Sequence, residues 1–179
     1  GDLVTTEAVG VYKGFKEVME EHGIEIVETL VDQGDPGLAA SMARECLAKH
    51  PDLAAVWAYY DYLGPTWAEA IIEAGRENVI LIANSLFPEQ VRYFLEHPGV
   101  IDAIIDFRQY DRGLIAGEIA YKLALAGQTK WTDVLRDYVS NYPEVKIMYW
   151  QFGVITQANY TVYAEQYPEV WQMMVGGGE

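Results

Sequence analysis

The chain of 179 residues is long enough for one α/β domain, and its 51% content of hydrophobic residues is sufficient for a sizeable buried core. Its 12 basic and 27 acidic residues give a net charge of −15, which argues against a nucleic-acid partner because phosphate binding requires clustered lysine and arginine. Anionic membrane surfaces are disfavoured for the same reason, and no stretch of sequence approaches the ~20 apolar residues needed to cross a bilayer.

The first part of the sequence predicts a helix, a strand and a second helix. Apolar residues recur at helical spacing over 5–21, and the segment 25–31 is predicted to form a short strand. Asp35 and Pro36 supply an N-cap and a first helical position for a helix over 38–49.

The stretch 53–61 is the strand around which we expect the domain to be organised. Its small and apolar residues show no polar alternation, which is typical of a strand covered on both faces in a parallel sheet. Tyr59, Tyr60, Asp61 and Tyr62 follow at its carboxyl end, where open α/β sheets bind ligands. The alternative is that the tyrosines pack at the strand end and that Asp61 caps the next turn.

Further strand–helix pairs follow along the chain. Strands are predicted over 79–83 and 101–107, and helices over 66–74, 88–96 and 110–126. Strand and helix alternate at intervals of about 25 residues, so the fold class is predicted to be α/β, with a parallel sheet flanked by helices. Beyond Gly127 this alternation ends, and the sequence indicates helices over 131–141 and 156–166, a strand over 145–152 and a frayed end over 173–179.

The histidines and the single cysteine are interpreted as structural residues. His22, His50 and His97 each follow a predicted helix, where an imidazole interacts favourably with the negative end of the helix dipole. Their spacing does not match a metal site. Cys46 lies at helical spacing with apolar neighbours and is interpreted as a core thiol. The sequence therefore predicts no metal site and no cofactor.

Motifs of common catalytic sites are absent from the sequence. It contains no dinucleotide-binding G-x-G-x-x-G after a strand, no phosphate-binding P-loop and no G-x-S-x-G nucleophile turn. A phosphate-accepting role for Asp61, as in receiver domains, lacks a paired acidic cluster near an earlier strand end. The sequence therefore favours binding over catalysis, and no enzymatic activity is predicted.

Three segments carry a resemblance to a known family. They are GFKEVM at 14–19, DLAAV at 52–56 and AIIEAGRENV at 70–79. Their order and spacing resemble the second half of a type I periplasmic solute-binding protein, of the kind that feeds sugar-type ABC importers, over roughly residues 9–127. Regulators of the lactose-repressor type share the same ligand domain. The segment 156–160 resembles the closing segment of transporter-linked members, which favours transport over regulation.

The resemblance implies a division of the chain into three parts. Members of the family have two lobes with a ligand cleft between them, and the cleft closes over the ligand by a hinge motion. The chain is then expected to begin after the first crossing between lobes, without the first lobe and without the strand that opens the second. Residues 1–109 would form the ligand-binding lobe, 110–143 a helix and connection that pack on the first lobe, and 144–179 a closing strand and C-terminal segment.

Strand-end positions and the resemblance together predict a ligand site along the carboxyl edge of the sheet. Its candidate residues are Tyr59, Tyr60, Asp61, Asn84, Ser85, Phe107 and Arg108. The family often has Asn-Asp where Tyr60-Asp61 stands, an aspartate near Asn84-Ser85, and a polar residue in place of Phe107. These departures and the aromatic faces favour an apolar, ring-shaped or stacked ligand over a simple pentose or hexose.

The predicted function is the solute-binding component of an ABC importer, which binds a sugar-like or aromatic, cyclic small molecule outside the cytoplasm. The compartment would be periplasmic or extracellular, including as a membrane-anchored lipoprotein. Expected partners are a membrane permease and, for the helix 110–126, either the absent first lobe or a second copy of the chain. This helix carries two small or apolar rows: Ile115, Ile119 and Leu123, and Ala116, Ala120 and Ala124. The alternatives are the effector domain of a lactose-repressor-type transcription regulator, or an α/β enzyme whose catalytic residues lie outside this chain.

Overall fold

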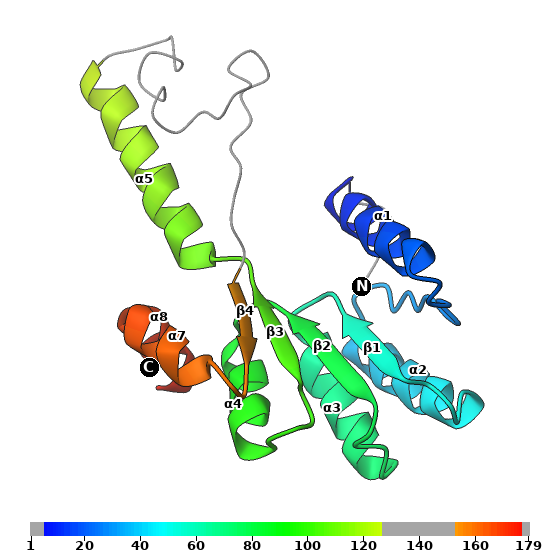
Figure 1. Ribbon diagram of the computed structural model, residues 1–179. Helices are drawn as coiled ribbons and strands as arrows, with labels where there is room; N and C mark the ends of the chain where they lie inside the picture. The colour runs from blue at the N-terminus through cyan, green and yellow to red at the C-terminus, as the bar shows by residue number, and fades with distance from the viewer. Residues whose placement is uncertain (1–5, 127–152, 177–179) are drawn as a thin grey trace. The chain divides into compact units, whose positions relative to one another are not determined.

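The structure is a computed structural model that describes residues 6–126 and 153–176 (Figure 1). The chain divides into two compact units, one formed by 1–104 with 155–179 and the other by 105–154. Its elements in chain order are α1 (Thr6–Glu21), α2 (Pro36–Lys49), β1 (Ala55–Ala58), α3 (Leu63–Glu73), β2 (Ile80–Asn84), α4 (Pro88–Glu96), β3 (Ala103–Asp106), α5 (Gln109–Ala126), β4 (Gly153–Thr156), α7 (Tyr160–Gln166) and α8 (Pro168–Val175).

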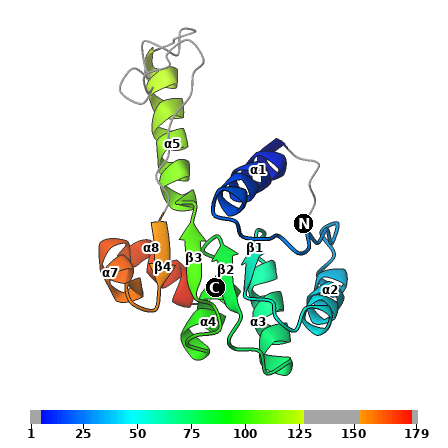
Figure 2. The same ribbon diagram turned by 45° about the vertical axis from the view of Figure 1, so that its right-hand side comes forward.

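The strands form one sheet in the order β1-β2-β3-β4. β1 and β2 are parallel, with Ala55 opposite Ile80 and Ala58 opposite Ala83. Figure 1 shows β4 running in the opposite direction to β3. α2 and α3 lie side by side in both views (Figures 1 and 2), and α3 in turn contacts α4. The predicted fold class, an α/β sheet flanked by helices, is confirmed.

The core of the first unit lies where α3 and α4 meet the sheet. Its fully buried side chains include Ile71 of α3, Leu81 of β2 and Phe94 of α4. Ile155 of β4 is also fully buried, and Trp171 of α8 packs against the same cluster. The returning segment after the second unit therefore completes the core of the first.

Local end signals set several helix boundaries as predicted. Asp35 caps α2, because its Oδ1 accepts hydrogen bonds from the amides of Gly37 at 2.8 Å and Leu38 at 3.1 Å. His50 and His97 are the C-caps of α2 and α4, and each donates its backbone amide to a carbonyl of the last helical turn at 2.9 Å.

The prediction of a strand over 25–31 is wrong. The side chains alternate as in a strand, with Ile26, Glu28 and Leu30 half-buried and Val27 exposed, but the segment belongs to no strand of the described sheet. A strand requires a hydrogen-bonding neighbour as well as an extended backbone. This segment is paired with no described strand.

Two further expectations are corrected. β1 is not covered on both faces: Ala55 is exposed and Val56 and Trp57 are half-buried, because β1 is the outermost strand of the described sheet. The end of the chain is not frayed from residue 173 onward, since α8 continues to Val175. The helix expected over 131–141 and the strand expected over 145–152 lie outside the described residues.

Candidate functional site

The carboxyl ends of β1 and β2 bring five of the predicted site residues to one edge of the sheet. Because the two strands are parallel and Ala58 pairs with Ala83, the residues that follow β1 lie beside the end of β2. These residues are Tyr59, Tyr60 and Asp61 after β1, and Asn84 and Ser85 at the end of β2. Phe107 and Arg108 follow β3 along the chain and belong to the second unit.

A continuous row of aromatic rings runs along this edge. Phe15 of α1 stacks on Trp57 with ring centroids 4.5 Å apart, and Trp57 meets Tyr59 edge to face at 5.7 Å. Tyr59 meets Tyr60 at 4.8 Å, and Tyr60 stacks with Tyr62 at 6.1 Å. These five residues are called the aromatic row below. Its four members from Trp57 onward are half-buried, so the rings present both packed and accessible surface.

Polar groups fix the strand ends beside the aromatic row. Trp57 donates its indole Nε1 hydrogen to Oδ1 of Asn84 at 3.1 Å, and Asn84 is 1% exposed. The buried side chain of Gln90 in α4 donates through Nε2 to the carbonyl oxygens of Asn84, at 3.0 Å, and of Ser85. The loop after β2 is thus held by a side chain of the following helix.

Tyr62 closes the row through a hydrogen bond to a buried carboxylate. Its hydroxyl donates to Oδ1 of Asp32 at 2.9 Å, and the amide of Gly34 donates to the same oxygen at 2.9 Å. Asp32 is 3% exposed. Burial raises the pKa of the Tyr62 hydroxyl, and the hydrogen bond to Asp32 raises it further, so the phenol stays protonated at neutral pH.

Asp61 caps the turn that follows β1, which is one of the two roles predicted from the sequence. It is exposed, and its Oδ1 accepts a hydrogen bond from the amide of Tyr62 at 2.9 Å in the turn before α3. This contact matches the interpretation of Asp61 as a turn-capping residue. The position at the carboxyl edge also keeps Asp61 within the predicted site.

In the described part of the chain, left-handed backbone conformations at residues other than glycine occur at Gln33, Ser85 and Arg108. Gln33 follows the segment ending at Asp32 with φ 56°, Ser85 follows β2 with φ 69°, and Arg108 follows β3 two residues on with φ 52°. Such conformations are uncommon for side chains larger than glycine and concentrate at functional sites. Ser85 and Arg108 are both predicted site residues.

Within the second unit, Arg108 is held by two aspartates. Its amide donates to Oδ1 of Asp106 at 2.7 Å, and its Nη2 forms an ion pair with Oδ2 of Asp111 at 2.6 Å. Both side chains of the ion pair are about three-quarters buried, at 27% and 26% exposure. Arg108 is therefore a positioned cation at the start of α5.

Sequence analysis did not include Trp57, Phe15 or Asp32 in the site. Trp57 and Tyr59 are two residues apart in an extended segment, so their side chains share a face, and this spacing could have identified Trp57. The contacts of Phe15 with Trp57 and of Asp32 with Tyr62 join distant parts of the chain, and no local pattern predicts them.

The sequence was compared with protein families, curated proteins and solved structures. Residues 1–129 match the model of the periplasmic binding protein domain. The chain belongs to the periplasmic binding protein family. No curated protein matches the sequence.

Solved structures of periplasmic binding proteins have the same fold. GanP, a glucose-galactose binding protein from Geobacillus stearothermophilus, is 24% identical with a TM-score of 0.64, over 83% of this chain and 48% of that one. A solute-binding protein from Agrobacterium vitis bound with α-D-tagatopyranose is 25% identical with a TM-score of 0.68, over 91% and 48%. A solute-binding protein from Bacillus halodurans with bound myo-inositol is 18% identical with a TM-score of 0.71, over 93% and 53%.

This chain spans about half the length of these relatives. The resemblance to type I periplasmic solute-binding proteins is confirmed by the family match and by the fold. The family and its solved members are binding proteins, which supports a ligand-binding role, and the family is extracytoplasmic. Among the helices that the structure describes, none combines the length and the apolar character that crossing a bilayer requires.

The second unit of this periplasmic binding protein carries exposed apolar side chains along α5. Leu114, Tyr121 and Leu125 are 56%, 64% and 71% exposed. Of the rows predicted from the sequence, Ala116, Ala120 and Ala124 are exposed and Ile115 is half-buried, and the large exposed side chains lie outside both rows.

Proposed function

We propose that the chain is the ligand-binding C-terminal lobe of an extracytoplasmic solute-binding protein that serves an ABC importer. The aromatic row beside Asn84 carries the proposal, because ring faces bind flat apolar surfaces and adjacent polar groups fix orientation. The proposed ligand is a neutral ring-shaped molecule, either a sugar-like polyol or an aromatic, cyclic compound.

Each predicted site residue has a role in this proposal. Tyr59 and Tyr60 stack on the ligand ring, and Asp61, Asn84 and Ser85 form hydrogen bonds to its polar substituents. Phe107 and Arg108 act from the start of α5, where the proposed hinge between lobes lies. The left-handed backbone of Ser85 and Arg108 supports this assignment, because residues with strained backbone conformations cluster at ligand-binding and active sites.

Closure of the site requires a second lobe in this proposal. The exposed apolar residues of α5 favour a partner that covers them, because burying apolar surface stabilises a complex by about 25 cal/mol per Å². The partner is the complementary lobe of the binding protein or a second copy of the chain. The closed form would deliver the ligand to a membrane permease from the periplasmic or extracellular side.

Isothermal titration calorimetry with cyclic polyols tests the proposal. The first probes are myo-inositol, D-tagatose and D-galactose, because proteins of this fold are described as binding these or related molecules. For a probe that binds, Asp61→Ala is expected to weaken the affinity by about 1–3 kcal/mol, or roughly 5- to 150-fold. Tyr59→Leu is expected to weaken it by a similar factor.

Asp52→Ala is the matched control for Asp61→Ala. Asp52 is an exposed aspartate in the turn before β1, at the opposite end of the strand from Asp61, and its removal should leave the affinity unchanged. If Asp61→Ala and Tyr59→Leu both bind the probe with the affinity of the original chain, the ligand site lies elsewhere and the proposal is wrong.

A further inference from the structure

Three potential metal ligands meet at the end of α2, away from the aromatic row. They are Glu28 from the extended segment before α2, Cys46 from the last turns of the helix and His50, its C-cap. One ligand atom of each lies within 4.8 Å of the other two. Cys46 is 5% exposed, and the side chains of His50 and Glu28 are 19% and 27% exposed, so the cluster is largely shielded from water.

We infer that this cluster is a binding site for a thiophilic divalent cation of the Zn²⁺ class. The structure supplies a sulfur, an imidazole nitrogen and a carboxylate oxygen, which are the three donor types that zinc uses in proteins. Zinc sites with three protein ligands take water at the fourth position, and the partial exposure of the Glu28 and His50 side chains leaves access for it.

The geometry of the cluster is close to that of a coordination shell. Cys46 and His50 are one helical turn apart and therefore share a face of α2. Nε2 of His50 lies 3.1 Å from Oε2 of Glu28. Bond lengths of about 2.0–2.3 Å at a tetrahedral zinc place neighbouring ligand atoms about 3.3–3.8 Å apart. The limit of 4.8 Å within which the three ligand atoms lie exceeds this range by about 1 Å. Small side-chain movements would therefore bring the ligand atoms into this range.

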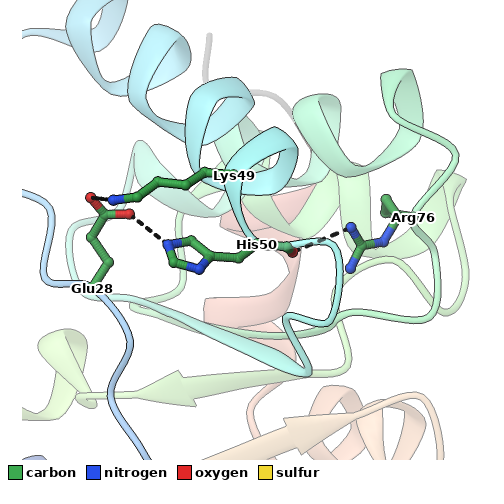
Figure 3. A network of polar contacts seen from close by, with 4 residues as sticks. All are labelled: Glu28, Lys49, His50 and Arg76. Carbon is green, nitrogen blue, oxygen red and sulfur yellow. Dashed lines mark hydrogen bonds and ion pairs between the residues drawn. The ribbon is translucent and has the colours of Figure 1, made fainter.

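Neighbouring side chains hold the ligands in these positions (Figure 3). Lys49 binds Oε1 of Glu28 at 3.0 Å, so the other carboxylate oxygen faces His50. Arg76 donates to the carbonyl oxygens of Leu47 at 3.4 Å and His50 at 3.5 Å, and it reaches the next turn as well. Such outer contacts orient the ligands of a metal site.

The protonation chemistry of the cluster is compatible with metal entry. Burial raises the pKa of the Cys46 thiol, and the charge of Glu28 raises it further, so the thiol is protonated at neutral pH. A divalent cation would displace this proton and bind the thiolate, and the cation would balance the charges of Cys46 and Glu28.

A bound cation would fasten the extended segment around Glu28 to α2. This segment is not paired into the described sheet, and Glu28 ties it to the helix end through contacts that include Lys49 and His50. The inference is independent of the proposed ligand site, because none of the three residues belongs to the aromatic row or to the strand ends.

Co²⁺ titration of the purified, tag-free chain tests the inference, because cobalt in a tetrahedral thiolate site absorbs strongly in the near ultraviolet. The chain should show this thiolate-to-cobalt absorption, and Zn²⁺ should remove it by displacing Co²⁺. Cys46→Ser should abolish the absorption. Glu28→Gln and His50→Gln should each weaken Co²⁺ binding by at least about tenfold.

His97→Gln is the matched control, because His97 is also the C-cap of a helix and is also followed by proline. Its Co²⁺ affinity should equal that of the original chain. Glu28→Gln keeps the experiment decisive if the buried Cys46 variant does not fold, because glutamine has the size of glutamate and keeps an oxygen that accepts hydrogen bonds from Lys49 or His50. The inference would be overturned if the thiolate band were absent at millimolar Co²⁺. It would also be overturned if Glu28→Gln and His50→Gln both bound Co²⁺ with the affinity of the original chain.

Discussion

Replacing Gly64 by alanine is expected to destabilise the first unit and to disturb the loop after β2. A Cβ at this position would overlap Oε1 of Gln90 and would lie 2.8 Å from its Cδ and 3.1 Å from the Cβ of Ala83. Gln90 is fully buried, so its side chain has no open space into which it could move. The methyl group must therefore push Gln90 away from the carbonyl oxygens of Asn84 and Ser85.

The expected loss of free energy of unfolding in Gly64→Ala follows from the contacts that the new methyl group disrupts. Overpacking of a core costs about 1–3 kcal/mol, and each of the two hydrogen bonds of Gln90 contributes about 0.5–1.5 kcal/mol. Alanine recovers up to about 1 kcal/mol through its higher helix propensity. Gly64→Ala should therefore lower the free energy of unfolding by about 1–5 kcal/mol.

Urea denaturation followed by circular dichroism measures this change. Gly14→Ala is the matched control, because no atom lies within 4 Å of a Cβ built there in α1, and it should be neutral or stabilising by up to about 1 kcal/mol. In a Gln90→Ala background, Gly64→Ala should cost less than about 1 kcal/mol, since the obstructing oxygen is gone. An equal cost in both backgrounds, or a Gly64→Ala variant as stable as Gly14→Ala, would refute the reasoning.

Further predictions concern Tyr62, Arg76 and α5. Tyr62→Phe should reduce stability by about 1.5–3 kcal/mol through loss of the hydrogen bond to Asp32. Because the folded-state pKa of Tyr62 is raised, its contribution is full below the ordinary tyrosine value of about 10 and declines above it, so the difference from Tyr62→Phe in urea denaturation should shrink at more alkaline pH. Arg76→Met should lower stability by about 1–3 kcal/mol, and hydrogen exchange should show faster exchange at the end of α2; unchanged exchange would contradict this role. Light scattering should show self-association of the chain through α5, reduced in Leu114→Gln; a monomer with α5 protected from hydrogen exchange would exclude pairing.

Local sequence signals predicted some helix boundaries, whereas α3 begins at Leu63 rather than at 66 and α7 at Tyr160 rather than at 156. α4 matches the prediction at both ends, because Pro88 fits the first helical position and His97-Pro98 cannot extend the helix. Asp35 and Pro36 set the start of α2 in the same way. The order of helices and strands in the first unit follows from such signals and from hydrophobic periodicity.

Features that depend on distant neighbours were not predictable from the sequence. The side-chain pattern over 25–31 predicted a strand, but strand formation also depends on a hydrogen-bonding neighbour, which no local pattern predicts. Glu28 and His50 are distant in the sequence and meet only in the folded chain, so no motif in the sequence identifies the cation cluster. The left-handed backbone of Ser85 has no local signal either, because serine rarely adopts it.

The strand ends that the sequence predicted to carry the candidate site are present in the structure, but several residues that contact them come from other parts of the chain. Tyr59 and Asn84 followed from the strand-end position alone. Trp57 lies one step inside β1 and joins the aromatic row because the edge position of that strand leaves its side chain half-buried. The ligand roles of these residues stay a prediction.

The insertion of the second unit between the two segments of the first has a consequence for biosynthesis. Translation proceeds at about 5–20 residues per second, so β4 leaves the ribosome on the order of seconds after β3. Until then Phe94 lacks the ring of Tyr160, which it meets at 5.9 Å, and β3 lacks its neighbouring strand. The nascent chain therefore exposes apolar surface and a sheet edge for this interval, and exposed edges of this kind favour pairing with other chains.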